Sequence, residues 1–221
     1  MRRIFTGLLC ALMLVISVRA DAGAQYVALT FDDGPSGRFT RRLLDGLAER
    51  DARATFLLCG YRLESYPEEG ARIAAEGHEI GIHGFSHDPM CHMTESRVTE
   101  EIQKTAALLP GGAIFLRPPG GKYNEATLAA AKKAGLAILS WSLDPKDWAT
   151  DDTAAIVSAV VEKVRDGDVI LLHDMSDSSV TAALRIIGRL HARGFRFVTV
   201  SQLAQIKGVE LVPGQVYTRF P

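Results

Sequence analysis

Two adjacent carboxylates, Asp32 and Asp33, follow the apolar run 26–29, and Gly34-Pro35 then turns the chain. Within a strand, successive side chains face opposite sides, but at a strand end that turns, both acids can face one cleft. Neighbouring carboxylates repel each other unless a cation or a shared proton relieves the repulsion. Taken alone, the pair allows either a functional site or an Asx-type turn with solvated acids.

Two histidines, His83 and His87, stand four residues apart. On one turn of helix, this spacing would bring both imidazoles to the same side. Neutral imidazoles are the commonest ligands of zinc-like metals, and one added carboxylate gives three protein ligands and an open position, as in catalytic zinc sites. The alternative is a polar turn with two incidental histidines.

One aspartate of the pair would suffice for a metal, which leaves the other free to act as a general base on water. His173 could protonate a leaving group, and Arg117 could pair with the base carboxylate. Either Asp144 or Asp147 could orient His173. These roles together indicate metal-assisted hydrolysis of an amide or an ester.

The elements that must position these groups alternate between strand and helix. Helical patterns separate seven apolar or β-branched runs, which are residues 25–31, 54–58, 79–83, 113–117, 136–141, 168–173 and 196–200. This alternation predicts an α/β fold with a parallel sheet, as a distorted, incomplete (β/α) barrel of about seven strands. A doubly wound open sheet is the competing architecture, although no Gly-rich dinucleotide loop follows the first strand. Both place active sites at the carboxyl ends of strands, where the candidate residues fall.

The composition fits one exported domain. The chain has 221 residues, 47% of them hydrophobic, and a formal net charge of −1, so no nucleic-acid surface is expected. A basic start, an apolar stretch and a small-x-small site predict a signal peptide at 1–22, with an uncleaved anchor as the alternative. The expected product is a catalytic domain at 23–221, secreted or associated with the cell envelope, in which Cys59 and Cys91 could pair.

Five segments resemble, in order, the motifs of the polysaccharide deacetylases, the family-4 carbohydrate esterases that share the NodB homology domain. They are TFDDGP at 30–35, His83-x-x-x-His87, RPPGG at 117–121, DPKDW at 144–148 and LLHD at 171–174. The resemblance implies a distorted (β/α) barrel that removes N- or O-acetyl groups from a sugar polymer.

The resemblance also implies a role for each motif residue. Asp33, His83 and His87 would bind one divalent metal, usually zinc, with cobalt or other ions also working. Asp32 would be the general base, His173 the general acid, and Arg117 would position the base. The supporting roles are a partner for His173 among Asp144 and Asp147, an acetyl-methyl pocket walled by Trp148 and Leu171, and an oxyanion-binding backbone N–H near Gly120.

Two positions depart from the family pattern. Gly84 stands where Ser or Thr usually follows the first histidine, which predicts a change in loop rigidity, and Gly120 stands where Tyr is often found. The expected protein is a monomer that acts on an N-acetylated glycan, foremost peptidoglycan N-acetylglucosamine. Chitin oligosaccharides and acetylxylan are alternative substrates. A non-catalytic glycan-binding barrel and an amidase acting on a non-sugar amide are the rival functions.

Overall fold

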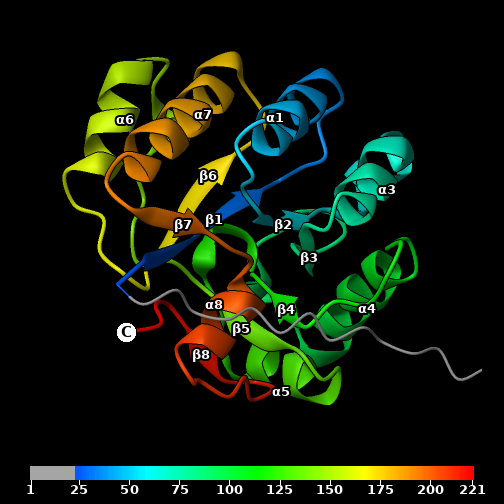
Figure 1. The fold of residues 1–221 in the computed structure, drawn as a ribbon. Helices are drawn as coiled ribbons and strands as arrows, with labels where there is room; N and C mark the ends of the chain where they lie inside the picture. Colours follow the sequence, from blue (N-terminus) through cyan, green and yellow to red (C-terminus); the bar gives the residue numbers. More distant parts are fainter. Residues whose placement is uncertain (1–22) are drawn as a thin grey trace, which may run out of the picture.

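A computed structural model describes residues 23–221, so the predicted signal peptide at 1–22 lies outside the described residues. The strands form one curled parallel sheet in the order β6-β1-β2-β3-β4-β5-β8, and β7 also pairs with β1 (Figure 1). All seven predicted strands are present. The strands are β1 (Gln25–Asp32), β2 (Ala54–Leu58), β3 (Glu79–Ile82), β4 (Phe115–Leu116), β5 (Ala137–Leu139), β6 (Val169–His173), β7 (Phe195–Phe197) and the unpredicted β8 (Val216–Tyr217).

Most helices cover the outside of this sheet, with α6, α7 and α1 side by side over β6 and β1 (Figure 1). The α-helices are α1 (Arg38–Ala48), α2 (Gly60–Ser65), α3 (Pro67–Ala75), α4 (Glu95–Ala106), α5 (Glu125–Lys133), α6 (Thr153–Val161), α7 (Asp177–His191) and α8 (Val200–Ile206). Three short 3₁₀ turns complete the set: η1 (Met90–His92), η2 (Pro119–Gly121) and η3 (Asp147–Ala149).

Local capping explains where several helices begin. Thr94, Asn124 and Ser176 each accept a backbone N–H in the first turn of the helix that follows, as N-cap residues do. Thr199 forms a capping box with Gln202, so α8 begins at Val200, which had been predicted to end the last strand. Pro67 begins α3 and separates it from α2, because proline is favoured in the first turn of a helix and cannot continue one.

β1 pairs with three other strands, two of them at the edge of the sheet. Its first residues, from Gln25 to Val27, pair with β7, and its later residues pair with β6 and β2. An isolated parallel bridge between Leu143 and Ile170 brings the segment after β5 next to β6. The sheet therefore curls round almost to closure, as the predicted incomplete barrel requires.

The alternation of side chains along β1 divides the core. Val27, Leu29 and Phe31 pack outward in the cluster that includes α1, α6 and α7. Tyr26 and Ala28 point to the inside of the barrel and pack against α8. The same alternation directs Asp32 to the inside, at the carboxyl end of the strand.

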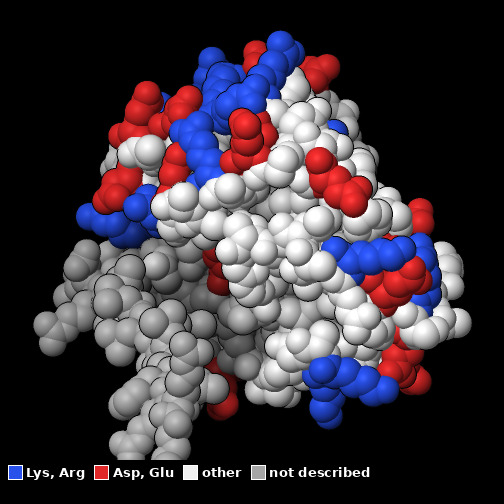
Figure 2. All heavy atoms as spheres, turned by 90° about the vertical axis from the view of Figure 1, so that its right-hand side faces the viewer, with Lys and Arg blue, Asp and Glu red and all other residues white. Residues whose placement is uncertain are grey.

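The surface charges, the cysteines and the apolar character of the helices complete the description of the fold. On the face shown in Figure 2, Lys and Arg side chains are interspersed with Asp and Glu around a mostly uncharged centre. Cys59 and Cys91 are both free thiols, so the disulfide considered from the sequence is not formed. No helix within residues 23–221 combines the length and the apolar character that crossing a membrane requires.

Candidate active site

A cleft of about 380 Å³ opens at the carboxyl ends of the strands, where the sequence had placed the candidate residues. Arg117 and Asp147 lie behind the cleft and contact residues that line it. The lining residues are Asp32, Asp33, His83, His87, Gly120, Trp141, Asp144, Trp148, Leu171 and His173. All five sequence motifs therefore contribute to one site.

Asp33, His83 and His87 form a cluster that could hold one metal ion, since their ligand atoms all lie within 4.8 Å of one another. Oδ1 of Asp33 is 3.2 Å from Nε2 of His83 and 3.0 Å from Nε2 of His87. The spacing of the two histidines would suit one turn of helix, but no helix is present there. The segment after β3 is irregular, with left-handed backbone at Gly84 (φ 81°) and His87 (φ 66°). This path brings the ring centroids of His83 and His87 to 5.1 Å from each other.

The hydrogen bonds around this cluster leave lone pairs that could bind a cation. Nδ1 of His83 lies 2.7 Å from the carbonyl oxygen of Arg117, which can only accept, so Nδ1 carries the proton of the neutral ring. Nε2 then presents a lone pair to Oδ1 of Asp33, which is buried and has no hydrogen-bond donor. Two lone pairs that face each other need a cation between them, and two imidazoles with one carboxylate are a donor set suited to zinc-like ions.

The electrostatics of the same three residues favour charge separation. Burial opposes ionisation of Asp33, but donors and positive charge at the positions of His83 and His87 outweigh it and hold the pKa of Asp33 well below its usual range. The carboxylate of Asp33 in turn raises the pKa of His87, which burial alone would lower. Asp33 is therefore an anion ready to bind a cation.

The buried side chain of Arg117 holds Asp32 in place. Nη1 of Arg117 is 2.6 Å from Oδ1 of Asp32, and the arginine side chain is fully buried. The same guanidinium donates to the hydroxyl of Thr30 and to the carbonyl oxygens of Leu139 and Ser140. This network fixes the orientation of the Asp32 carboxylate, whose Oδ2 lies 3.7 Å from Nε2 of His83.

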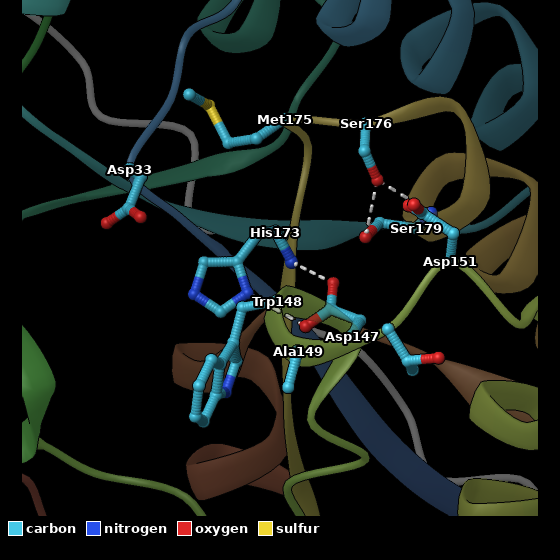
Figure 3. Close-up of a pocket in the computed structure, with 10 residues that line it drawn as sticks. Asp33, Asp147, Trp148, Ala149, Asp151, His173, Met175, Ser176 and Ser179 are labelled. Atoms are coloured by element: carbon cyan, nitrogen blue, oxygen red, sulfur yellow. Dashed lines mark hydrogen bonds and ion pairs between the residues drawn. The ribbon is translucent and has the colours of Figure 1, made fainter.

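His173 faces the cleft from the end of β6, and Asp147 is its partner (Figure 3). Oδ1 of Asp147 is 2.8 Å from Nδ1 of His173, and Oδ2 accepts the backbone N–H of His173 at 2.8 Å. Burial opposes a charge on His173, but Asp147, with help from Asp32 and Asp33, raises the pKa of His173 to about 9. Asp144, the other candidate, instead accepts the backbone N–H of Lys146.

The remaining predicted residues line the cleft. Leu171 is buried and Trp148 is 64% exposed at the rim, beside Trp141. Gly120 has left-handed backbone (φ 64°), and a side chain there would enter open space. A tyrosine at this position would add an aromatic wall to the cleft, and Gly120 adds none.

A second hollow of about 490 Å³ continues from the cleft past His173 (Figure 3). Asp33, Asp147, Trp148 and His173 line it together with residues that the sequence had not singled out. Those are Ala149, Thr150, Asp151, Met175, Ser176 and Ser179. The sequence offered one signal that these residues line the site, which is their closeness to the fourth and fifth motifs.

Comparisons with known proteins place the chain among deacetylases. The model of the family described as "Polysaccharide deacetylase" matches residues 19–139. A peptidoglycan-N-acetylglucosamine deacetylase of Bacillus cereus is 36% identical over 82% of this chain and 89% of its own length. A chitooligosaccharide deacetylase of Sinorhizobium fredii is also 36% identical, over 80% and 91% of the two chains.

A solved structure resembles the whole fold as well. It is a family 4 acetyl xylan esterase of Clostridium thermocellum in complex with a cobalt ion, with a TM-score of 0.81 and 33% identity. The alignment covers 89% of this chain and 100% of that one. Together with the family match over more than half of the sequence, these similarities show that the chain belongs to the polysaccharide deacetylase family.

Proposed function

We propose that this protein hydrolyses the N-acetyl group of N-acetylglucosamine residues in peptidoglycan, with one divalent metal ion, Zn²⁺, held by Asp33, His83 and His87. The observation that carries the proposal is the placement of two fixed acid–base groups around this three-ligand cluster. Asp32 is oriented by Arg117, and His173 by Asp147. The similarity to the Bacillus cereus enzyme supports the choice of substrate.

Each residue then has one task in the reaction. When bound, the metal ion supplies Lewis acidity toward the acetyl carbonyl and toward water. Asp32, as general base, takes a proton from the water that attacks the carbonyl carbon. His173 donates a proton from Nε2 to the sugar nitrogen as the carbon–nitrogen bond breaks, since Nδ1 is occupied by Asp147.

The walls of the cleft orient the acetyl group. Leu171 and Trp148 would contact the methyl carbon, and a backbone N–H near Gly120 would stabilise the negative charge on the carbonyl oxygen. In this proposal residues 1–22 are a signal peptide and residues 23–221 the catalytic domain. The enzyme would then act outside the cytoplasm or in the cell envelope, where peptidoglycan lies.

Acetate release tests the proposal. The purified protein is incubated with peptidoglycan, chitin oligosaccharides and acetylxylan, each with and without a chelator. We expect release from peptidoglycan that stops with the chelator and returns on addition of Zn²⁺ or Co²⁺. Release from chitin oligosaccharides or acetylxylan alone would refute the substrate, and release unaffected by the chelator would refute the metal.

Two substitutions separate the base from the metal ligands. Asp32→Asn is expected to lower turnover by about 10²–10⁴-fold and to retain the metal. His83→Ala is expected to lose both the metal and turnover. Undiminished activity of the Asp32→Asn variant would rule out Asp32 as the base.

A further inference from the structure

Glu101 of α4 is a buried carboxylate outside the cleft. Its side chain is 1% exposed. Oε2 accepts the backbone N–H groups of Phe85 and Ser86 at 2.7 Å and 2.8 Å, and the hydroxyl of Ser86 lies 3.1 Å from the same oxygen. Hydrogen bonds to a charged acceptor are shorter and stronger than neutral ones, so two consecutive peptide groups are held by one oxygen atom.

The peptide groups that Glu101 holds lie between the two histidines of the cluster. The backbone is left-handed at Gly84 and again at His87, where φ is 66°. A residue with a side chain rarely adopts that conformation unless its surroundings impose it. Within residues 83–87 no regular secondary structure supplies the constraint, so contacts from neighbouring elements must do so.

Contacts with α2 fix the other side of this loop. The backbone N–H of Gly60 donates to the carbonyl of Gly84 at 3.0 Å, and that of Tyr61 donates to the carbonyl of Phe85 at 3.1 Å. A side chain at Gly60 would meet the Phe85 ring at 2.2 Å, which shows how closely the loop packs there. The loop is therefore clamped between α2 and Glu101, and His87 follows directly.

Arg97, which is partly exposed to solvent, forms an ion pair with Glu101. Nη2 of Arg97, one helical turn earlier, lies 2.9 Å from Oε1 of Glu101. A buried carboxylate needs a cationic partner or a set of hydrogen-bond donors, and Glu101 has both. Glutamine at this position could accept a hydrogen bond but would bring an amide donor toward Arg97 and could not attract two N–H groups as an anion does.

We propose that Glu101 is a positioning residue of the metal site, which it acts on through the loop. By holding the N–H groups of Phe85 and Ser86, it keeps His87 in the left-handed conformation that directs Nε2 toward Asp33. This inference rests on the proposed metal site. It predicts that metal affinity depends on a glutamate that touches neither the metal ligands' donor atoms nor the substrate.

Metal affinity and amide exchange together test this role. The variant is Glu101→Gln, and the matched control is Glu100→Gln. Glu100 precedes Glu101 on α4, has a side chain that is 45% exposed, and pairs with Arg97 and Lys104. We expect the dissociation constant for Zn²⁺ to rise about 10-fold in the variant and to stay within about twofold in the control, as for other residues that orient metal ligands.

Hydrogen exchange is measured on the metal-free proteins. The amides of Phe85 and Ser86 are expected to exchange faster in Glu101→Gln than in Glu100→Gln. If Glu101→Gln does not fold, Glu101→Asp replaces it, because this shorter carboxylate keeps the charge but cannot reach both N–H groups, and at least threefold weaker Zn²⁺ binding is expected. Equal Zn²⁺ affinity in variant and control would overturn the inference, whereas failure of the unsubstituted protein to bind Zn²⁺ would overturn the proposed function itself.

Discussion

The contact between Asp147 and His173 leads to a quantitative prediction for the pH dependence of activity. Asp147→Asn removes the negative charge and keeps one side-chain oxygen, which can still accept the backbone N–H of His173. The amide group of asparagine then faces Nδ1 as a donor. His173 therefore loses the acceptor that now stabilises its protonated form.

The size of the effect follows from the pKa of His173. It lies at about 9, against 6.5 for an ordinary histidine, a difference worth about 3 kcal/mol. Without Asp147, His173 loses the contact that contributes most to stabilising its protonated form, and burial opposes the charge, so the pKa falls to about 6.5 or below. A general acid must be protonated, and at pH 8 the protonated fraction falls from about nine tenths to about 3%, an activity loss of about 30-fold.

The assay is the pH dependence of kcat/KM for acetate release. The alkaline limb is expected near pH 9 in the unsubstituted enzyme and near pH 6.5 or lower in Asp147→Asn. Asp177→Asn is the control, since Asp177 is an exposed acid close to His173 in sequence that pairs with Arg42 instead. An alkaline limb that stays in place in Asp147→Asn would refute the role of this contact.

Three further predictions concern stability. Arg117→Ala removes a fully buried cation from its carboxylate partner and is expected to lower the free energy of unfolding by about 3–5 kcal/mol in urea titrations. Gly167→Ala would place a methyl group 1.7 Å from the carbonyl oxygen of Phe220, so its melting temperature should fall well below that of Gly194→Ala, which has the same φ and no such neighbour. Burial lowers the pKa of His78 from 6.5 to about 4, so the unfolded chain binds a proton first as the pH falls. Up to about 3 kcal/mol of stability is then lost between pH 6.5 and 4, and His78→Asn should flatten that part of the profile.

The alternation of strand and helix was predictable because it depends on local periodicity. In a parallel sheet all strands point the same way, so residues that follow different strands meet at one end of the barrel. This is why Asp32, His83, Arg117 and His173 could be grouped from the sequence. β8 escaped prediction because two paired residues carry no periodic pattern.

Loop geometry could not be predicted in the same way. The spacing of His83 and His87 suggested a helix, but close packing against Gly60 and the bonds to Glu101 impose another path. The choice between Asp144 and Asp147 depends on the left-handed residue Lys146 (φ 58°). It turns the chain between the two acids, so that Asp147 reaches Nδ1 of His173 whereas Asp144 accepts the backbone N–H of Lys146.

Glu101 carried a signal that could have been read from the sequence. It shares one face of its helix with Val98 and Thr105, three residues before and four residues after it, and both are buried. A charged residue on the buried face of an amphipathic helix needs a partner, and that need alone could have marked it. What the sequence could not supply is the identity of the partner, since the N–H groups of a neighbouring loop leave no trace in composition.

One backbone angle separates the side chains of the two adjacent acids. Asp32 still belongs to β1, so its side chain points into the barrel, where Arg117 meets it. Asp33 has φ of 71° and leaves the strand, which turns its carboxylate toward both imidazoles. An aspartate tolerates this conformation better than most residues, but it remains unfavourable, and His87 adopts a similar one on the opposite side of the cluster. Both left-handed residues thus bring ligand atoms to the cluster, where Oδ1 of Asp33 has no hydrogen-bond donor, and this arrangement suits a bound cation.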